Sequence, residues 1–268
     1  MHDLVHAMVG DPWTAADSAA VLAAVRSVWN FEAPELRRLT GLVGALDQTD
    51  PNGVAARLGP WLEGGRYGWV FDTPGAARLE TDRPVVGCDL TAVMDEPKVR
   101  TPIVEYLMQW GRLYHKGHRH AWVLDEFWKL LDDDYFRVKI KDLLKTIRKA
   151  GGILIGATQS PEDATDSQIA SAILGQSVTK VFLPNEDCTE ATYIGRLGLT
   201  AEEYTRLRRW QKDSRCFLLK QGQTSVVLGF DLAGVPEIAL LSPSARTMRR
   251  FDEGAAGADP MRWVEELT

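Results

Sequence analysis

Apolar residues in the first 60 positions of the chain recur at the spacing of helices rather than strands. Thr14 can cap a helix whose apolar residues fall three or four positions apart. These residues are Val21, Leu22, Val25, Val28 and Trp29. A second apolar series follows Pro34, and a third, shorter one follows Gly53. The pattern predicts a helical subdomain over residues 1–63.

The pattern changes after Gly64 and Gly65, where short runs rich in β-branched and aromatic residues begin. Strands are predicted at 67–71, 84–90, 120–124 and 152–157, with helices from 103 to 114 and from about 134 to 150. Alternating strands and helices are typical of an α/β fold with a mostly parallel sheet and helices on both faces. We expect this architecture to extend from residue 64 to residue 242.

The pattern in the last third of the chain predicts a strand at 178–183 and a helix that begins with a capping box at Thr200 and Glu203. Two β-rich runs, 216–219 and 225–231, flank Gln221-Gly222 and predict an antiparallel hairpin at the edge of the sheet. Residues 243–268 are rich in Arg, Gly and Ala, and we expect a loosely held C-terminal tail there.

Composition narrows the class of protein without naming a function. Hydrophobic residues make up 45% of the chain and charged residues 25%, as in ordinary globular proteins. No apolar run reaches 18 residues, and the first residues do not resemble a signal peptide, so we expect a cytoplasmic protein. The net charge of −6 gives no global attraction to DNA. The three cysteines are far apart in the sequence and suggest neither disulfides nor zinc.

Two adjacent carboxylates, Asp125 and Glu126, follow the apolar run Trp122-Val-Leu124. In an α/β sheet the carboxyl end of a strand opens onto the ligand crevice. Asp125 could hold Mg²⁺ through water, because this ion retains most of its waters and takes few carboxylates. Glu126 could orient or deprotonate an attacking water. The alternative is an acidic strand end at a solvated turn.

A second polar group follows the next predicted strand, 152–157, which is apolar throughout, as expected for a strand buried on both faces. It ends in Thr158-Gln159-Ser160-Pro161. If the two strands are neighbours, Gln159 lies beside Glu126, where its amide can sense a γ-phosphate or hold a water. The alternative is a helix-capping turn with Pro161 at the first helical position.

Several runs together resemble the TrbE/CagE family of type IV secretion and conjugation ATPases. They are VLDEFWKLL (123–131), GATQSPEDA (156–164), ILGQSVTKVFLPN (173–185), GLTAEEY, RCFLLKQGQTSVV and, upstream, GRYGWVFDT (65–73). The runs occur in order over nearly the whole chain, which is more specific than any single motif. The resemblance implies a RecA-like P-loop NTPase core.

The resemblance also implies roles for individual residues. By this resemblance Asp125 and Glu126 are the Walker-B pair, and Gln159 is the glutamine of the next motif. Asp125 and Thr158 would lie on the side of the nucleotide and its Mg²⁺. Arg215 becomes a candidate arginine finger that reaches a neighbouring subunit. A solvated strand residue or a surface ion pair is an equal alternative for Arg215. The rival arginines are Arg196, Arg206, Arg208 and Arg209.

The sequence departs from the family in one respect: it contains no GxxxxGK[ST] phosphate loop. Such a loop neutralises the β- and γ-phosphates with backbone N–H groups and a lysine. We therefore expect the C-terminal part of a motor domain, a truncated reading frame or fragment, that binds ATP weakly and hydrolyses it scarcely at all by itself.

The function implied by the resemblance is ATP hydrolysis, with Mg²⁺, that drives pilus assembly and substrate transfer in a type IV secretion apparatus. The parent protein would work as a hexamer, peripheral at the inner membrane, with other subunits of the apparatus as partners. One alternative is a catalytically inactive interaction fragment. Another is a DNA-pumping motor of the HerA/FtsK type, although DNA binding is not indicated because a strong basic channel is absent.

Other polar groups have simpler interpretations. His115, His118 and His120 fall in a turn rather than at the spacing of metal ligands on a helix. The lysines and arginines between 139 and 149 form the solvated face of a helix, because its opposite face is apolar. Cys88 and Cys188 have no visible base that would make either a nucleophile.

Overall fold

The computed structural model describes residues 1–33, 36–73, 84–114, 117–126, 131, 134–211, 214–231 and 235. The chain divides into two compact units, Met1–Ile173 and Leu174–Thr268. The boundary falls inside the segment 64–242 that the sequence predicted as one α/β domain. The predicted tail, 243–268, lies outside the described residues. None of the described helices is long and apolar enough to cross a membrane.

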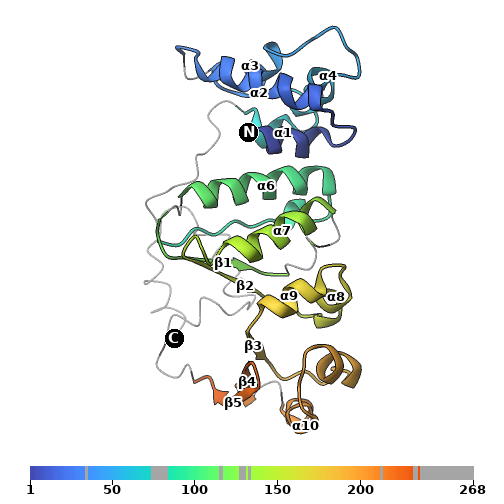
Figure 1. The fold of residues 1–268 in the computed structure, drawn as a ribbon, viewed down its shortest axis with the longest axis vertical. Helices are drawn as coiled ribbons and strands as arrows, with labels where there is room; N and C mark the ends of the chain where they lie inside the picture. Colours follow the sequence, from blue (N-terminus) through green and yellow to red (C-terminus); the bar gives the residue numbers. More distant parts are fainter. Residues whose placement is uncertain are drawn as a thin grey trace, which may run out of the picture. The chain divides into compact units, whose positions relative to one another are not determined.

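The first unit begins with a helical bundle, as predicted (Figure 1). Its helices are α1 (His2–Val9), α2 (Ala15–Trp29), α3 (Leu39–Gly44) and α4 (Val54–Leu58), followed by a 3-10 turn, η2 (Gly59–Trp61). Thr14 caps α2 through a capping box with Asp17, because the Thr14 hydroxyl accepts from the Asp17 N–H and the Asp17 carboxylate accepts from the Thr14 N–H. One apolar cluster that includes Val5, Val21 and Leu58 forms the core of the bundle.

The predicted strand at 67–71 is wrong, because the segment folds as a short helix, α5 (Gly68–Phe71). The backbone must turn sharply before it: a Cβ at Gly65 would lie 2.6 Å from the carbonyl oxygen of Pro60. Tyr67 then packs against Trp61 with 4.8 Å between the centroids of the two tilted rings. Packing on the bundle overrides the β propensity of the aromatic and branched residues.

The predicted strand at 84–90 also differs from the structure, which has no strand in this segment. Asp89 instead accepts a hydrogen bond from the N–H of Thr91 and begins the 3-10 turn η3 (Thr91–Val93). Val85 is 83% exposed. The segment is therefore apolar in sequence but pairs with no strand within the described part of the chain.

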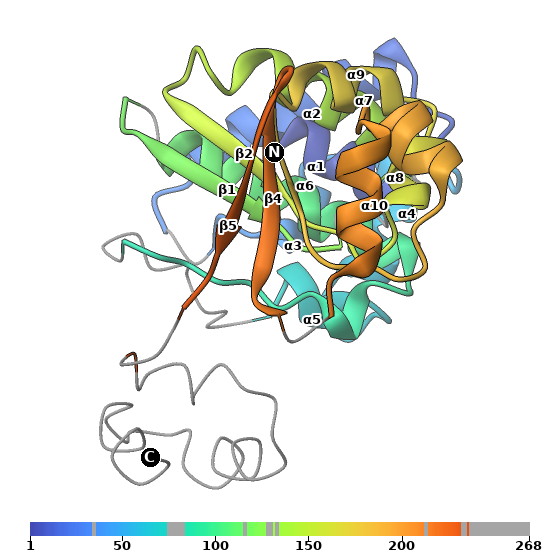
Figure 2. The same ribbon diagram turned by 90° about the horizontal axis from the view of Figure 1, so that it is seen from below.

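The second layer of this unit is α/β. It comprises α6 (Pro97–Tyr114), β1 (His120–Leu124), α7 (Asp134–Thr146), β2 (Gly152–Gly156), α8 (Pro161–Asp166) and α9 (Ala170–Gln176), whose last residues cross into the second unit. Helix α6 begins six residues before the predicted start, so Pro102 lies inside it. Strands β1 and β2 run parallel, with His120 opposite Gly152 and Leu124 opposite Gly156. Figures 1 and 2 show the two strands side by side.

One face of the β1–β2 pair is covered by helices, and the other is exposed. Trp122, Leu124 and Leu154 pack on the apolar stripes of α6 and α7, around the buried Phe136 and Ile140. The alternate residues Val123, Ile153 and Ile155 are 66%, 58% and 47% exposed. The expectation that 152–157 is buried on both faces is therefore wrong for this chain, and an apolar face of the sheet lies open.

The second unit contains an antiparallel sheet in the order β3-β4-β5. Its strands are β3 (Thr179–Phe182), β4 (Cys216–Gln221) and β5 (Thr224–Gly229), and its helical elements are a π-helical turn, η5 (Ala191–Arg196), and α10 (Ala201–Arg209). The predicted hairpin is confirmed, with Gly222 in its two-residue turn at φ 59°, but it belongs to this separate antiparallel sheet and not to the edge of the parallel β1–β2 sheet. Thr200 caps α10 through the predicted capping box with Glu203.

Candidate functional site

The carboxyl ends of β1 and β2 lie at the same edge of the sheet, because the strands are parallel and in register. Leu124 is opposite Gly156, and the Ala157 N–H donates to the Leu124 carbonyl at 2.9 Å. Asp125 and Ala157 therefore start their loops at neighbouring positions, about 5 Å apart in a sheet of ordinary spacing. The register brings the loop of Asp125 and Glu126 beside the loop of Thr158 and Gln159.

Glu126 has a left-handed backbone, with φ 48°. This region is uncommon for residues other than glycine and costs of order 1 kcal/mol or more. The Glu126 N–H donates to Asp125 Oδ1 at 3.1 Å, which fixes the turn immediately after the strand. Asp125 is exposed and Glu126 is half-buried. A strained turn that presents two carboxylates at a strand end is a feature of functional sites.

The loop after β2 is a hydroxyl turn. The Ser160 N–H donates to Thr158 Oγ1 at 3.0 Å, and the Thr158 hydroxyl in turn lies 3.2 Å from the Ser160 carbonyl oxygen. Pro161 begins α8, as the capping interpretation predicts, although the Ser160 side chain makes no cap hydrogen bond. Gln159 is exposed at the tip of this turn. The turn therefore leaves the Gln159 amide on the surface while the Thr158 hydroxyl is engaged locally.

Arg215 belongs to the second unit, directly before β4, and is the other residue besides glycine with a positive φ, 53°, among the described residues. Its side chain is 65% exposed, and Nη1 lies 4.0 Å from Asp231 Oδ1. Two of the rival arginines contact their own helix: Arg206 pairs with Glu202 at 2.8 Å, and Arg208 lies over the ring of Tyr204. Arg196 ends η5 and Arg209 ends α10.

The residues at the carboxyl edge fit part of a nucleotide site. Asp125 uses Oδ1 for the turn, which leaves Oδ2 on an exposed carboxylate for a hydrated Mg²⁺. Among the described residues no group of three or more His, Cys, Asp or Glu side chains converges as a metal cage would require. His118 and His120 lie at the other end of β1, and His115 lies outside the described residues. Among the described residues, this edge could therefore offer a cation the carboxylates of Asp125 and Glu126 but no metal cage.

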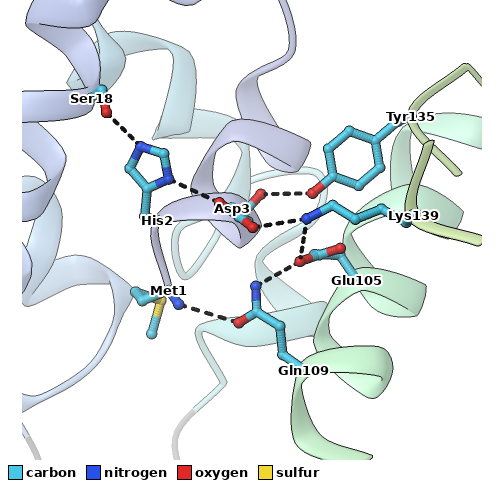
Figure 3. A network of polar contacts seen from close by, with 8 residues as sticks. All are labelled: Met1, His2, Asp3, Ser18, Glu105, Gln109, Tyr135 and Lys139. Carbon is cyan, nitrogen blue, oxygen red and sulfur yellow. Dashed lines mark hydrogen bonds and ion pairs between the residues drawn. The ribbon is translucent and has the colours of Figure 1, made fainter. Parts of the chain in front are cut away.

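A polar network inside the first unit was missed by the sequence analysis, which assigned Lys139 to a solvated face (Figure 3). Lys139 Nζ donates to Asp3 Oδ2 at 2.8 Å and to Glu105 Oε1 at 3.3 Å. Glu105 is 2% exposed and also accepts from the Gln109 amide at 2.6 Å. The network joins α1, α6 and α7, and α7 is the helix that connects the loop of Glu126 to β2.

The position of Lys139 in the apolar pattern of α7 could have indicated that its side chain is partly buried. Lys139 precedes the buried Leu143 by four residues and follows the buried Phe136 by three, so it borders the apolar stripe of α7. A lysine at such a border can bury its stem and direct its ammonium inward. No local pattern, however, identifies Asp3 as its partner, because the two residues lie 136 positions apart.

Comparison with known proteins gives a family match over most of the chain. The TraG P-loop domain family matches residues 43–214. This range includes both loops at the carboxyl edge of the β1–β2 sheet and extends through α10. The match thus covers the residues that the sequence analysis singled out at 125, 126, 158 and 159.

Curated relatives are type IV secretion proteins. The chain is 39% identical over 232 residues to the type IV secretion system protein virB4 of Bartonella henselae, covering 85% of this chain and 30% of the relative. It is 35% identical over 266 residues to the type IV secretion system protein PtlC of Bordetella pertussis, covering 94% of this chain and 32% of the relative. The chain therefore spans about a third of the length of these relatives.

A solved structure gives the same fold. VirB4 of Thermoanaerobacter pseudethanolicus superposes with a TM-score of 0.66 at 16% identity, covering 87% of this chain and 68% of that chain. The expected resemblance to type IV secretion ATPases and the expected α/β P-loop fold are both confirmed by these comparisons. The roles of the individual site residues stay predictions.

Proposed function

The chain belongs to the family of TraG P-loop domains, and on that premise we propose that it is the Walker-B part of a type IV secretion ATPase. The observation that carries the proposal is the parallel register of β1 and β2, which starts the loops of Asp125 and Gln159 at neighbouring positions. Parallel strands of P-loop proteins bind their ligand at this edge.

Each residue at the edge has a defined task in the proposal. ATP supplies the phosphoryl group that is transferred to water. Asp125 holds Mg²⁺ through a water, because its Oδ2 is not used by the turn. Glu126 orients the attacking water and accepts its proton. Gln159 holds that water or senses the γ-phosphate with its amide. Thr158 lies on the nucleotide side of its turn.

Arg215 is the proposed arginine finger, acting on the nucleotide of a neighbouring subunit in a hexamer. Support comes from its exposed side chain, which makes a long contact to Asp231, whereas Arg206 and Arg208 contact their own helix. The strained φ of 53° is a second argument, since such strain persists where function requires one backbone geometry.

The 268 residues contain no glycine-lysine phosphate loop, so the β- and γ-phosphates lack the N–H and lysine donors that such motors use. We therefore infer that this chain hydrolyses ATP scarcely by itself and requires a polypeptide segment that carries the loop. The intact motor would work at the inner-membrane face of the apparatus, with its other subunits as partners, in pilus assembly or conjugative transfer.

A direct test compares ATP hydrolysis by the chain alone with hydrolysis by the chain joined to a phosphate-loop segment of a VirB4 relative. We expect turnover only in the joined protein. Glu126→Gln should lower that turnover by about 100-fold or more while nucleotide binding persists, because it removes the general base. Asp125→Asn should weaken Mg²⁺-dependent nucleotide binding. Glu162→Gln, a half-buried glutamate in the adjacent α8, is the matched control and should retain turnover.

Two results would contradict the proposal: fast turnover by the isolated chain that Glu126→Gln leaves unchanged, or a joined protein that binds nucleotide equally well with and without Asp125. One observation favours a second candidate, a non-catalytic interaction part. The apolar face of Val123, Ile153 and Ile155 lies open, as at a docking surface. A joined protein that assembles with further copies but never hydrolyses ATP would support this second candidate.

A further inference from the structure

A cavity of about 250 Å³ lies at the amino end of β1, the opposite end from Asp125. Its apolar lining comes from Trp122, Leu143 and Ile147, with Ala150 at the rim. Small-molecule sites usually occupy about 300–1,000 Å³. The cavity is smaller than that and fits one large side chain of a partner better than a free ligand.

Two glycines leave room for the two ring side chains, Trp122 and His120, that line this cavity. A Cβ at Gly111 would lie 2.3 Å from the indole of Trp122, and a Cβ at Gly152 would lie 2.4 Å from Nε2 of His120. The His120 Nδ1–H donates to the carbonyl oxygen of His118 at 2.9 Å, which fixes the imidazole in the wall. The wall is thus a packed, preformed surface rather than a gap between mobile side chains.

Basic residues occur on the chain segments next to the cavity, and one of them, Arg112, lines it. The loop 117–119 and the turn 148–151 are neighbours, because His120 and Gly152 pair and the His120 N–H points to the Gly151 carbonyl at 3.4 Å. These two segments, with the end of α6, form what we term the amino-edge rim. It consists of Arg112, His118, Arg119, Arg148 and Lys149, all exposed. Five exposed basic residues on neighbouring segments form a local positive region in a chain of net charge −6.

The rim matches an acidic peptide better than a nucleic acid. Asp142 pairs with Arg112 at 3.8 Å and interrupts the positive charge beside the opening, so the rim offers separate basic groups rather than the continuous basic groove that a nucleic-acid backbone follows. The Trp122 indole packs against Gly111, so its face is not a platform for stacking bases. A carboxylate side chain can pair with Arg148 at one point, while a neighbouring apolar residue enters the cavity.

We propose that the amino-edge rim and its cavity form a docking site for an acidic peptide segment that inserts one aromatic or aliphatic side chain between α6, β1 and α7. The site lies at the amino edge of the β1–β2 sheet, and the proposed nucleotide residues lie at the carboxyl edge. A partner can therefore occupy it without covering Asp125 or Glu126. From the sequence, the histidines of the first segment were predicted to form a turn, and the lysines and arginines between 139 and 149 to form the solvated face of a helix.

The test uses the full chain and a fluorescent acidic peptide of alternating glutamates around one central phenylalanine. Binding is measured by fluorescence anisotropy at physiological salt. Ala150→Trp fills the rim of the cavity from an exposed position, and Arg148→Glu reverses one rim charge without touching the core. Each should weaken binding about tenfold or more. Lys98→Glu, an exposed charge reversal at the other end of α6, is the matched control and should leave binding unchanged.

A peptide variant, duplex DNA and phosphatidylglycerol vesicles serve as further controls. Replacing the phenylalanine by serine should abolish binding, since the anchor is lost, and circular dichroism confirms that each protein variant is folded. Three results would overturn the proposal: no binding of the peptide, binding that Ala150→Trp leaves intact, or tighter binding of duplex DNA or phosphatidylglycerol vesicles than of the peptide. The last result would identify a general anion surface instead.

Discussion

Lys139 on α7 donates to the carboxylate of Asp3 on α1 at 2.8 Å and, with the same ammonium, to the buried carboxylate of Glu105 on α6 (Figure 3). One side chain thereby connects the helical bundle to the layer that carries the proposed nucleotide-site residues. Glu105 Oε2 is buried and makes no hydrogen bond within the described part of the chain. The cluster therefore relies on Lys139 for its charge balance.

Removing the Lys139 ammonium should destabilise the first unit. Lys139→Met keeps the apolar stem but leaves the Glu105 carboxylate buried without a counter-charge, which costs about 3 kcal/mol. Lys141→Met, an exposed lysine two residues further along α7, is the matched control and should change stability by less than about 0.5 kcal/mol. Urea unfolding monitored by circular dichroism measures both. Equal midpoints for the two variants would contradict the proposed role of Lys139.

The same cluster predicts a pH dependence. Hydrogen bonds from Lys139 and from His2 lower the pKa of the Asp3 carboxyl from 3.8 to about 2. A lowered pKa means that the stabilisation is complete above pH 3.8 and is lost as the pH falls towards 2. Because half of the Asp3 side chain is exposed, we expect a loss of about 1 kcal/mol.

Asp3→Asn isolates this contribution from those of other carboxylates. The difference in unfolding free energy between wild type and Asp3→Asn should shrink between pH 4 and pH 2, and thermal unfolding at a series of pH values measures it. A difference that stays constant over this window would show that Asp3 does not titrate with a lowered pKa.

Asp72 fixes the start of α3 and the turn after η2. It is 1% exposed and accepts hydrogen bonds from Arg38 Nε at 3.1 Å, the Thr40 N–H at 3.2 Å and the Glu63 N–H at 2.9 Å. Burial alone would raise the pKa of this carboxyl, but these hydrogen bonds and that from the Thr40 hydroxyl together lower it. Asp72→Asn should destabilise the protein by about 3 kcal/mol, because the amide turns a donor towards these donors.

The exposed Glu63, which also pairs with Arg38, supplies the control for Asp72. Glu63→Gln should have an effect within about 0.5 kcal/mol, as expected for a surface ion pair. Chemical unfolding of the two variants under identical conditions makes the comparison. If Glu63→Gln costs as much as Asp72→Asn, burial is not the source of the effect.

The backbone at Glu126 predicts a conflict between stability and function. At φ 48° glycine is free of the Cβ strain that any other residue carries. Glu126→Gly should therefore be more stable than Glu126→Ala by about 1 kcal/mol, a comparison in which both variants lack the carboxylate. Thermal unfolding of the two variants measures this. A glycine variant no more stable than the alanine variant would argue against strain at this position.

Gly111 on α6 should not tolerate a side chain. The added Cβ of Gly111→Ala would meet the Trp122 indole at 2.3 Å, so the ring must move and the protein should lose about 2 kcal/mol. Gly175→Ala in α9 is the control, since nothing lies within 4 Å of its Cβ, and it should be neutral or slightly stabilising. Thermal unfolding distinguishes the two. Similar behaviour of both variants would show that Trp122 is not held against α6.

The sequence alone determined the elements whose signals are local. The helix cap at Thr14, the capping box at Thr200 and the Gly222 turn depend on residues within three positions, and the structure contains all of them. The strand at 120–124 and the polar residues after it were also predicted from an apolar run and its end. Neighbouring parallel strands then place their ends together, as the register of β1 and β2 confirms.

Only the tertiary structure decided where these local signals were overridden. Residues 67–71 have strand-like composition but pack as a helix against Trp61, and the open face of Ile153 and Ile155 depends on which elements cover the sheet. Lys139 finds Asp3 across 136 residues. Such contacts depend on chain segments that meet only after folding, so no spacing within one element encodes them.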